Sequence, residues 1–376
     1  MALRALASVN LAAAARNVTR LRSGLAGNAQ LCAVVKADAS GHGAVSIART
    51  ALHAGATRLA VATVGEAVQL REAAIAAPVL IMGAISAEEL PDALSARAEV
   101  VAWSESFVRS LAARRPARPI AVHVKLDTGL GRLGTRALDE AVAVADAVCA
   151  AAPALALTGA MTHFATADDD LAFMHAQLAA FRPFADELRR RAPAVIVHAA
   201  NSAATVREPA THFDMVRCGI ALHGCDPMNS DPDSAGLEPV MQLSSYVAAV
   251  KPIRPGESAG YGRRFIAERE TVIATMPIGY ADGIRRGLSN NCDVLIAGRR
   301  HPLVGTVSMD NVTVDLGESG AWVPVGTEAI LIGRSGGERQ TVEDLANRLG
   351  TVAHEVLCGI GPRVPRRYHW DGEPVR

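Results

Sequence analysis

Short apolar runs alternate with amphipathic stretches through the first 225 residues. Eight runs have the length of buried strands: 31–36, 58–64, 77–83, 99–103, 120–126, 155–163, 194–199 and 215–222. Apolar positions at helical spacing fill most of the gaps, in Ala44–Ala54, Gly65–Ala74, Phe107–Arg114, Leu138–Ala151 and Leu171–Arg191. Strands that alternate with helices pair in parallel through right-handed crossovers. A count of eight predicts an α/β fold with a (β/α)8 TIM-like barrel rather than an open doubly wound sheet.

The pattern changes after the turn-rich segment 229–234. The later apolar runs are joined by Gly and Pro turns and predict strands at Gln242–Val250, Thr271–Pro277, Asp293–Ala297, Asn311–Leu316 and Glu328–Ile332. One helix is expected there, over Val342–Val356. The length of 376 residues also exceeds what one hydrophobic core usually supports. We therefore expect a barrel over residues 1–233 and a C-terminal β-rich domain over residues 234–376.

The Ala-rich N-terminus predicts an ordinary amphipathic helix rather than a secretory signal. Asn10 can cap the helix, and apolar positions from Leu11 to Leu21 fall on one side while the arginines fall largely on the other. No apolar run approaches the roughly 20 residues that span a bilayer. These features predict a cytoplasmic protein that makes no membrane contact.

Charge and cysteine spacing exclude several classes of partner. Lys plus Arg and Asp plus Glu number 38 each, and no basic stripe is present, so nucleic acid is not an expected partner. The six cysteines include no C-x-x-C pair, which argues against a zinc site and against a disulfide framework. We expect no metal and a reducing compartment.

Polar residues collect where the predicted barrel strands end, which is where barrels of this kind build their active sites. By strand, they are Lys36; Lys125 and Asp127 with the following Arg132; His163; His198, Asn201 and Ser202; and Arg217 with Gly219 and Ile220. Such a gathering predicts a small-molecule site.

The types of these residues favour pyridoxal 5'-phosphate as a cofactor. A lysine at the end of an apolar strand sits in low dielectric, which favours the neutral amine that forms Schiff bases with carbonyls. The Ser202 hydroxyl and the Gly219 and Ile220 amides can hold a phosphate, while Arg217 can meet a ring nitrogen. A lone lysine in this position more often extends to solvent, and a lone histidine more often belongs to the core. The prediction depends on the convergence of these groups.

Several motifs resemble those of alanine racemases, in the family's order and across nearly the whole chain. They are VVKADASGHG, VKLDTGLGRLG, MTHFATAD, HAANSAA, SAGYG around Tyr261, PIGYADG around Tyr280, GTVSMDNVTVD around Met309, and CGIGPRVPR. Independent motifs in one order are far more specific than a single short pattern.

The resemblance implies a role for each of these residues. Lys36 would bind pyridoxal phosphate and act as a base on one face of the substrate, with Tyr261 on the opposite face. Tyr261 would come from the second subunit of a head-to-tail homodimer, in which each β domain completes the other subunit's site. Arg217 would meet the pyridine nitrogen, with His163 and His198 connecting it toward Tyr261.

The remaining residues would bind substrate or support the site. Substrate contacts would come from Arg132 and from the backbone amide of Met309, and support from Asn201, Tyr280 and Asp310. Lys125 matches a lysine often carbamylated in the family, where the added carboxylate orients the arginine.

Two positions depart from the family's usual pattern. Ser40 stands where a tyrosine usually helps to hold the phosphate, and Pro362 stands where some members carry a second phosphate-reaching tyrosine. A serine is too short to reach the same place. We expect looser cofactor retention and a wider entrance.

The leading functional hypothesis is an isomerase that interconverts L- and D-alanine and so supplies D-alanine for peptidoglycan. A wider entrance keeps open a racemase for serine or for a broad set of amino acids. A barrel-type amino-acid decarboxylase shares the architecture, but its usual C-terminal cysteine motif and long glycine-rich phosphate loop are not found. A non-catalytic pyridoxal-phosphate carrier would have no use for Tyr261.

Overall fold

The computed structural model describes residues 3–318 and 320–375. It divides into two compact units. One comprises Ala15–Ala39 and Gly43–Leu222, and the other comprises the chain up to Ala14, Ser40–His42, and the chain from His223 onward. We call them the barrel unit and the β unit. The predicted domain boundary after Asp233 stays a prediction.

The barrel unit contains a strand at each of the eight predicted apolar runs. These are β2 (Gln30–Val34), β3 (Arg58–Val61), β4 (Val79–Ile81), β5 (Glu99–Ala102), β6 (Ile120–Lys125), β7 (Leu155–Met161), β8 (Ile196–His198) and β9 (Met215–Cys218). Each pairs in parallel with its neighbour in the order β8-β7-β6-β5-β4-β3-β2-β9. Two hydrogen bonds between the β8 and β9 segments complete the ring. The Asp214 amide donates to Val197 O and the Arg217 amide donates to Ala200 O, both at 3.0 Å. The expected barrel is confirmed.

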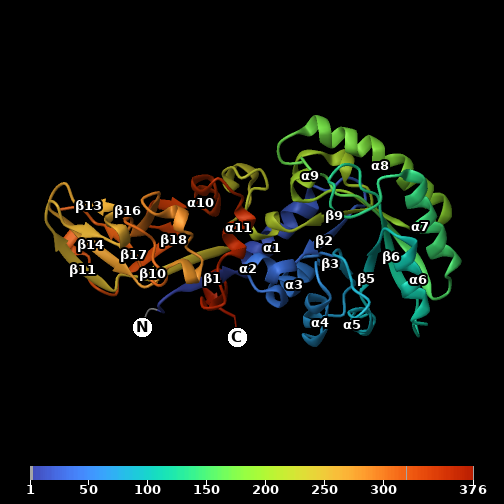
Figure 1. Cartoon of the computed structure of the whole chain (residues 1–376), viewed down its shortest axis with the longest axis horizontal. Coiled ribbons are helices and arrows are strands. Elements are labelled where there is room, and N and C mark those ends of the chain that lie inside the picture. The colour runs from blue at the N-terminus through green and yellow to red at the C-terminus, as the bar shows by residue number, and fades with distance from the viewer. Residues whose placement is uncertain (1–2, 319, 376) are drawn as a thin grey trace. The chain divides into compact units, whose positions relative to one another are not determined.

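Helices lie outside these strands, as the blue-to-green part of Figure 1 shows. They are α1 (Leu11–Ser23), α3 (Ala44–His53), α4 (Val64–Glu72), α5 (Leu90–Ser95), α6 (Glu105–Ala113), α7 (Leu138–Ala150), α8 (Leu171–Arg191) and α9 (Ser202–Arg207). Asn10 caps α1 as predicted, since its Oδ1 accepts from the Ala12 and Ala13 amides at 3.1 and 3.3 Å. The pattern missed α5 and α9 because six residues are too few to show a helical period.

The β unit is built on a large, mostly antiparallel sheet. Within the described residues its strands run β11 (Ala249–Ile253), β14 (Thr271–Met276), β17 (Val312–Asp315), β16 (Arg299–Val304), β15 (Cys292–Ile296), β18 (Glu328–Ser335), β10 (Met241–Tyr246), β1 (Leu6–Asn10), β20 (Arg366–Trp370) and β21 (Glu373–Pro374), with β19 (Glu338–Gln340) beside β18. A separate pair is formed by β12 (Ser258–Ala259) and β13 (Phe265–Ile266). The predicted β-rich domain is confirmed, although β1 comes from the far N-terminus, where five residues gave no strand signal.

Two predicted elements of this unit are wrong in detail. The run 242–250 forms two strands, β10 and β11, rather than one. The single predicted helix Val342–Val356 is two helices, α10 (Val342–Leu349) and α11 (Ala353–Cys358). Gly350 ends α10 with a left-handed φ of 66°, a conformation that glycine adopts without steric cost and that a continuous helix cannot contain.

Short 3-10 turns complete the chain at Pro209–Thr211, Ile220–His223, Pro232–Ala235, Tyr261–Arg263, Tyr280–Asp282, Arg286–Leu288 and Gly320–Trp322. No helix in the described part of the chain is long and apolar enough to cross a membrane.

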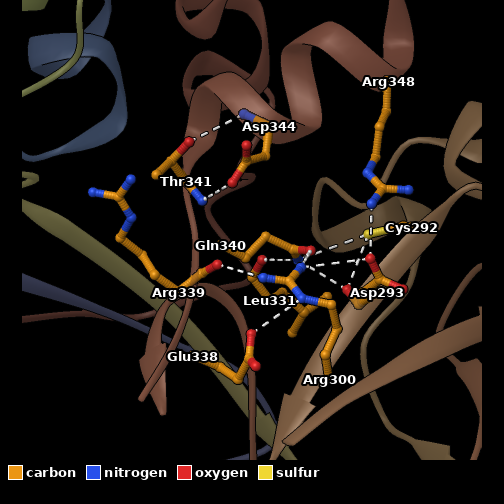
Figure 2. A network of polar contacts seen from close by, with 10 residues as sticks. All are labelled: Cys292, Asp293, Arg300, Leu331, Glu338, Arg339, Gln340, Thr341, Asp344 and Arg348. Atoms are coloured by element: carbon orange, nitrogen blue, oxygen red, sulfur yellow. Dashed lines mark hydrogen bonds and ion pairs between the residues drawn. The ribbon is translucent and has the colours of Figure 1, made fainter. Parts of the chain in front are cut away.

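A polar network attaches α10 to the sheet of the β unit (Figure 2). Gln340 is fully buried, and its Nε2 donates to Leu331 O at 2.6 Å and to Asp293 O at 2.8 Å. Arg348, in the last turn of α10, donates to Asp293 Oδ2 at 2.7 Å. At the other end of the helix Thr341 and Asp344 form a reciprocal cap. These bonds satisfy buried polar groups and fix the helix at both ends.

Candidate active site

Lys36 lies directly after β2 and begins an unusual left-handed turn. The turn, α2 (Lys36–Gly41), has φ between 51° and 54° at four consecutive non-glycine residues, 37–40. Left-handed helix costs L-residues about 1–2 kcal/mol each. One distant and one local bond hold it: the Ala37 amide donates to Glu66 Oε1 at 2.6 Å, and the Ala44 amide donates to Asp38 Oδ1 at 2.7 Å. Such strain is concentrated at functional sites, and here it begins at the residue after Lys36.

Arg217, on β9, is the central group at this end of the barrel. It is 2 % exposed. Its Nη1 contacts His198 Nδ1 at 2.9 Å, and its Nη2 contacts His163 Nδ1 at 3.1 Å and the Thr162 and Ala199 carbonyls at 3.0 Å. Within the described residues no hydrogen bond uses its Nε, which therefore stays available as a donor. Burial lowers the pKa of Arg217 to about 10, so the guanidinium is still charged at neutral pH.

The two histidines beside Arg217 are neutral and have defined tautomers. Burial, and then the charge of Arg217, hold the pKa of both His163 and His198 well below the usual range. Because arginine only donates, each Nδ1 must accept and each proton must sit on Nε2. His198 Nε2 then bonds to His123 Nδ1 at 2.8 Å. Both ring nitrogens of His198 are thus used inside the barrel, and its predicted role in linking Arg217 toward Tyr261 stays a prediction. The His163 proton on Nε2 is not used by Arg217.

Lys125 and Arg132 lie at the end of β6 and in the loop that follows it. Lys125 is 3 % exposed, whereas Arg132 is exposed. Burial, followed by the charges of Arg217 and Arg132, lowers the pKa of Lys125 to about 8. The loop is held by Asp127, whose carboxylate accepts from the Gly129 and Gly131 amides at 3.0 to 3.1 Å. This arrangement gathers cations at one end of the barrel.

The predicted phosphate-binding groups are adjacent. Ser202 Oγ accepts from the Gly219 amide at 3.0 Å and lies 3.5 Å from the Ala221 amide. Asn201 caps α9 through Oδ1, which accepts from the Ala204 amide at 3.0 Å. Gly219 also adjoins the strand that leads to Lys36, because a Cβ added to it would lie 3.4 Å from Val34 Cβ. The hydroxyl, the amides including that of Ile220, and Lys36 therefore share neighbouring strand ends.

Sequence reasoning missed several buried polar residues at this site. Gln177, 1 % exposed on α8, donates to Thr128 Oγ1 at 3.2 Å and to His163 O at 3.4 Å, and so connects the loops after β6 and β7. Thr128 Oγ1 is 2.8 Å from Thr162 Oγ1. A buried Gln on an otherwise apolar helical stripe was the available signal. His123 and Glu99 were also missed, because His123 lies within its strand and Glu99 begins its strand, at the end of the barrel opposite the predicted site.

The other predicted residues belong to the β unit, where loops bring them together. Thr306 Oγ1 donates to Tyr261 O at 2.7 Å, the Tyr280 amide donates to Ser308 O at 2.9 Å, and the Ala281 amide donates to Met309 O at 3.1 Å. Tyr261 is 75 % exposed, Met309 52 % and Tyr280 42 %. Asp310 accepts from Arg363 at 2.7 Å. Three large side chains of these loops, one of them a phenol, are thus exposed.

Comparison with known proteins places the whole chain in one family. Residues 9–227 match the family model of the alanine racemase N-terminal domain, and residues 240–368 match that of the C-terminal domain. The alanine racemase of Geobacillus kaustophilus is 41% identical over 95% of this chain and 92% of its own length. That of a Nostoc species is 40% identical over 96% of this chain and 95% of its own.

Solved structures agree. The alanine racemase of D-cycloserine-producing Streptomyces lavendulae has a TM-score of 0.93 at 37% identity. The match covers 98% of this chain and 98% of the other. The Bacillus anthracis alanine racemase with bound L-Ala-P has a TM-score of 0.91 at 35% identity, covering 100% of this chain and 97% of the other. Identity above 30% over nearly the full length, together with two family models in order, shows that the chain belongs to the alanine racemase family.

Proposed function

We propose that the protein is an alanine racemase that interconverts L- and D-alanine with pyridoxal 5'-phosphate. The observation that carries the proposal is the buried, charged Arg217 with an unused Nε, set between the strand ends of Lys36 and of Ser202. A buried guanidinium with a spare donor fits an uncharged aromatic nitrogen. The curated relatives and solved neighbours are named as alanine racemases.

The residues present fit this cofactor. Lys36 would bind it covalently through Nζ, while Ser202 Oγ and the Gly219 and Ile220 amides would hold its phosphate. Arg217 Nε would donate to the ring nitrogen, and because arginine keeps its proton, that nitrogen would remain unprotonated. When bound, pyridoxal phosphate supplies an electron sink that acidifies the α carbon of an amino acid.

Racemisation requires a proton to leave one face of the α carbon and another to arrive on the opposite face. Lys36 Nζ would hold or release the proton on one face and the Tyr261 phenol on the other. Arg132 would bind the substrate carboxylate, and the Met309 amide would contact the substrate from the Tyr261 side. His163 Nε2–H is the barrel donor available to orient a phenolate.

We propose a homodimer with shared sites, in which Tyr261 and Met309 act on the partner subunit's barrel. The exposed cluster of Tyr261, Tyr280 and Met309 supports this, since exposed aromatic and Met side chains are enriched at interfaces. We also propose that the protein is located in the cytoplasm, where it would supply D-alanine for peptidoglycan.

A racemisation assay over several amino acids tests the function. Purified protein loaded with pyridoxal phosphate is incubated with L-alanine, L-serine or L-lysine, and the D-enantiomer and released carbon dioxide are measured. We expect D-alanine to form fastest. Faster formation of D-serine would assign a broader racemase, consistent with Ser40 widening the entrance, and carbon dioxide without D-amino acid would assign a decarboxylase.

A further inference from the structure

A line of buried polar side chains crosses the barrel from one end of its strands to the other. Glu99 is the first residue of β5, His123 lies on β6, His198 ends β8, and Arg217 lies on β9. The contacts are Arg217 Nη1 to His198 Nδ1 at 2.9 Å, His198 Nε2 to His123 Nδ1 at 2.8 Å, and His123 Nε2 to Glu99 Oε2 at 3.3 Å. Both imidazoles and the arginine are at most 2 % exposed. We call these four residues the barrel relay.

The direction of every hydrogen bond in the barrel relay follows from its ends. Arg217 can only donate, so His198 Nδ1 accepts and His198 carries its proton on Nε2. That proton is donated to His123 Nδ1, which leaves the His123 proton on Nε2, facing Glu99. The Glu99 carboxylate, which can only accept, lies 3.3 Å from this nitrogen, an ion-pair contact longer and less well aligned than the other bonds of the relay. The donor Arg217 at one end of the relay and the acceptor Glu99 at the other thus select a single tautomer at each histidine.

The barrel makes specific room for His123. A Cβ built on Gly159, the neighbouring position of β7, would lie 2.0 Å from His123 Nδ1. The β6–β7 register also shifts between Val122 and His123. A side chain at position 159 would therefore occupy the place of the ring, so glycine is required for the relay to pass.

Glu99 also supplies a negative charge that balances the positive charge of Arg217 at the other end of the relay. In the described part of the chain no carboxylate forms an ion pair with Arg217, although the group is buried and charged. Burial by itself would raise the pKa of Glu99, but the contact with His123 and the charges of Arg58 and Arg71 hold it below its usual range. Arg58 Nε donates to Glu99 Oε2 at 3.1 Å. Glu99 is thus an anion at the far end of the relay.

We propose that Glu99 and His123 are positioning residues for the active site: through His198 they fix the orientation and donor pattern of Arg217 from the opposite end of the barrel. The role of Arg217 toward a ring nitrogen rests on the proposed function, whereas the tautomers belong to the protein itself.

The first test reads the tautomers directly in the cofactor-free protein. Histidine-selective 15N labelling and ring-nitrogen NMR of the full chain should show His123 and His198 each protonated on Nε2 only, with assignments from H123Q and H198Q. E99A should move His123 toward the Nδ1–H form and shift the His198 signals. E105Q is the matched control, because Glu105 forms an exposed ion pair with Arg109 on α6. A wild-type His123 protonated on Nδ1, or His198 signals unchanged in E99A, would overturn the proposal, as would equal shifts in E105Q.

The second test reads the consequence for the reaction. E99Q keeps the shape of the side chain, which protects folding. It should lower kcat about tenfold with little change in KM, the size typical when a residue that orients a functional group through a hydrogen bond is lost. E99D, which keeps the charge, should recover more of the rate than E99Q does. Correct tautomers with an unchanged E99Q rate would remove the positioning role. If the protein has no racemase activity, the NMR outcome still decides the tautomers and the proposed function alone fails.

Discussion

We predict that the Lys125 amine reacts with carbon dioxide, because an unusually large fraction of it is neutral at physiological pH. Burial, and then the charges of Arg217 and Arg132, lower its pKa from 10.5 to about 8. At pH 7.4 about 20% of the amine is then neutral, against roughly 0.1% for a lysine in water, a gain of a few hundred-fold. Neutral amines attack carbon dioxide to form a carbamate and release one proton. The carbamate would replace a crowded cation with an anion beside Arg132.

Carbon-13 NMR in the presence of labelled bicarbonate measures this directly, because the chain has only three lysines, Lys36, Lys125 and Lys251. We expect one carbamate signal in the wild type that K125A abolishes, while K251A, at an exposed position, leaves it intact. At constant dissolved carbon dioxide the signal should grow as pH rises, and more steeply below about pH 8, where the amine must also lose its own proton, than above it. Absence of the signal, or its survival in K125A, would refute the reasoning.

The same shift has a consequence for stability. Charging Lys125 in the folded state costs roughly 3 kcal/mol more than in the unfolded chain. That cost is fully present below pH 8 and is relieved as pH rises from 8 toward 10.5, because the unfolded chain then binds more protons. In carbonate-free buffer at pH 7, the free energy of unfolding of the K125M variant should therefore exceed that of the wild type by up to roughly 3 kcal/mol in a denaturant titration. The difference should shrink by pH 10. A K125M variant less stable than the wild type at pH 7 would contradict the depressed pKa.

Three other substitutions test separate parts of the account. Y261F should leave cofactor absorbance intact and slow racemisation of L-alanine by at least about a hundredfold, since a positioned acid or base contributes that much or more; unchanged turnover would remove the two-base assignment. S40Y should tighten cofactor binding by about tenfold or more in a spectroscopic titration, since a hydrogen bond to a charged group contributes about 1.5–3 kcal/mol; nanomolar binding already in the wild type would contradict it. G159A should lower the free energy of unfolding by about 1–3 kcal/mol in a denaturant titration, because its Cβ would overlap His123; wild-type stability would show that the ring has room to move.

The barrel could be predicted from the sequence because each strand is a short apolar run, and such runs survive as a signal whatever the tertiary context. The elements that could not be predicted are those decided by distant partners. β1 gains its place by pairing with β10 and β20, far along the chain. The break between α10 and α11 depends on one glycine within an otherwise helical pattern.

The candidate site divides in the same way. Lys36, His163, Ser202 and Arg217 stand at strand ends, where barrel geometry makes polar residues visible in the sequence. His123 lies inside a strand and Glu99 at the start of one, and nothing local distinguishes them from ordinary strand residues. Their significance comes from contacts across the barrel. The glycine at position 159, which leaves room for the His123 ring, is the related feature in the sequence. The left-handed turn after Lys36 was equally invisible, because its four residues are not glycines.

The central claim is that two groups on opposite faces of one α carbon exchange its proton with solvent. The most direct measurement incubates the loaded protein with L-alanine in heavy water and follows optical rotation and α-deuterium together during the first turnovers. We expect the D-alanine formed to carry deuterium while the remaining L-alanine is still largely protiated. D-alanine that retains its original proton, or a rotation that never decays, would contradict it.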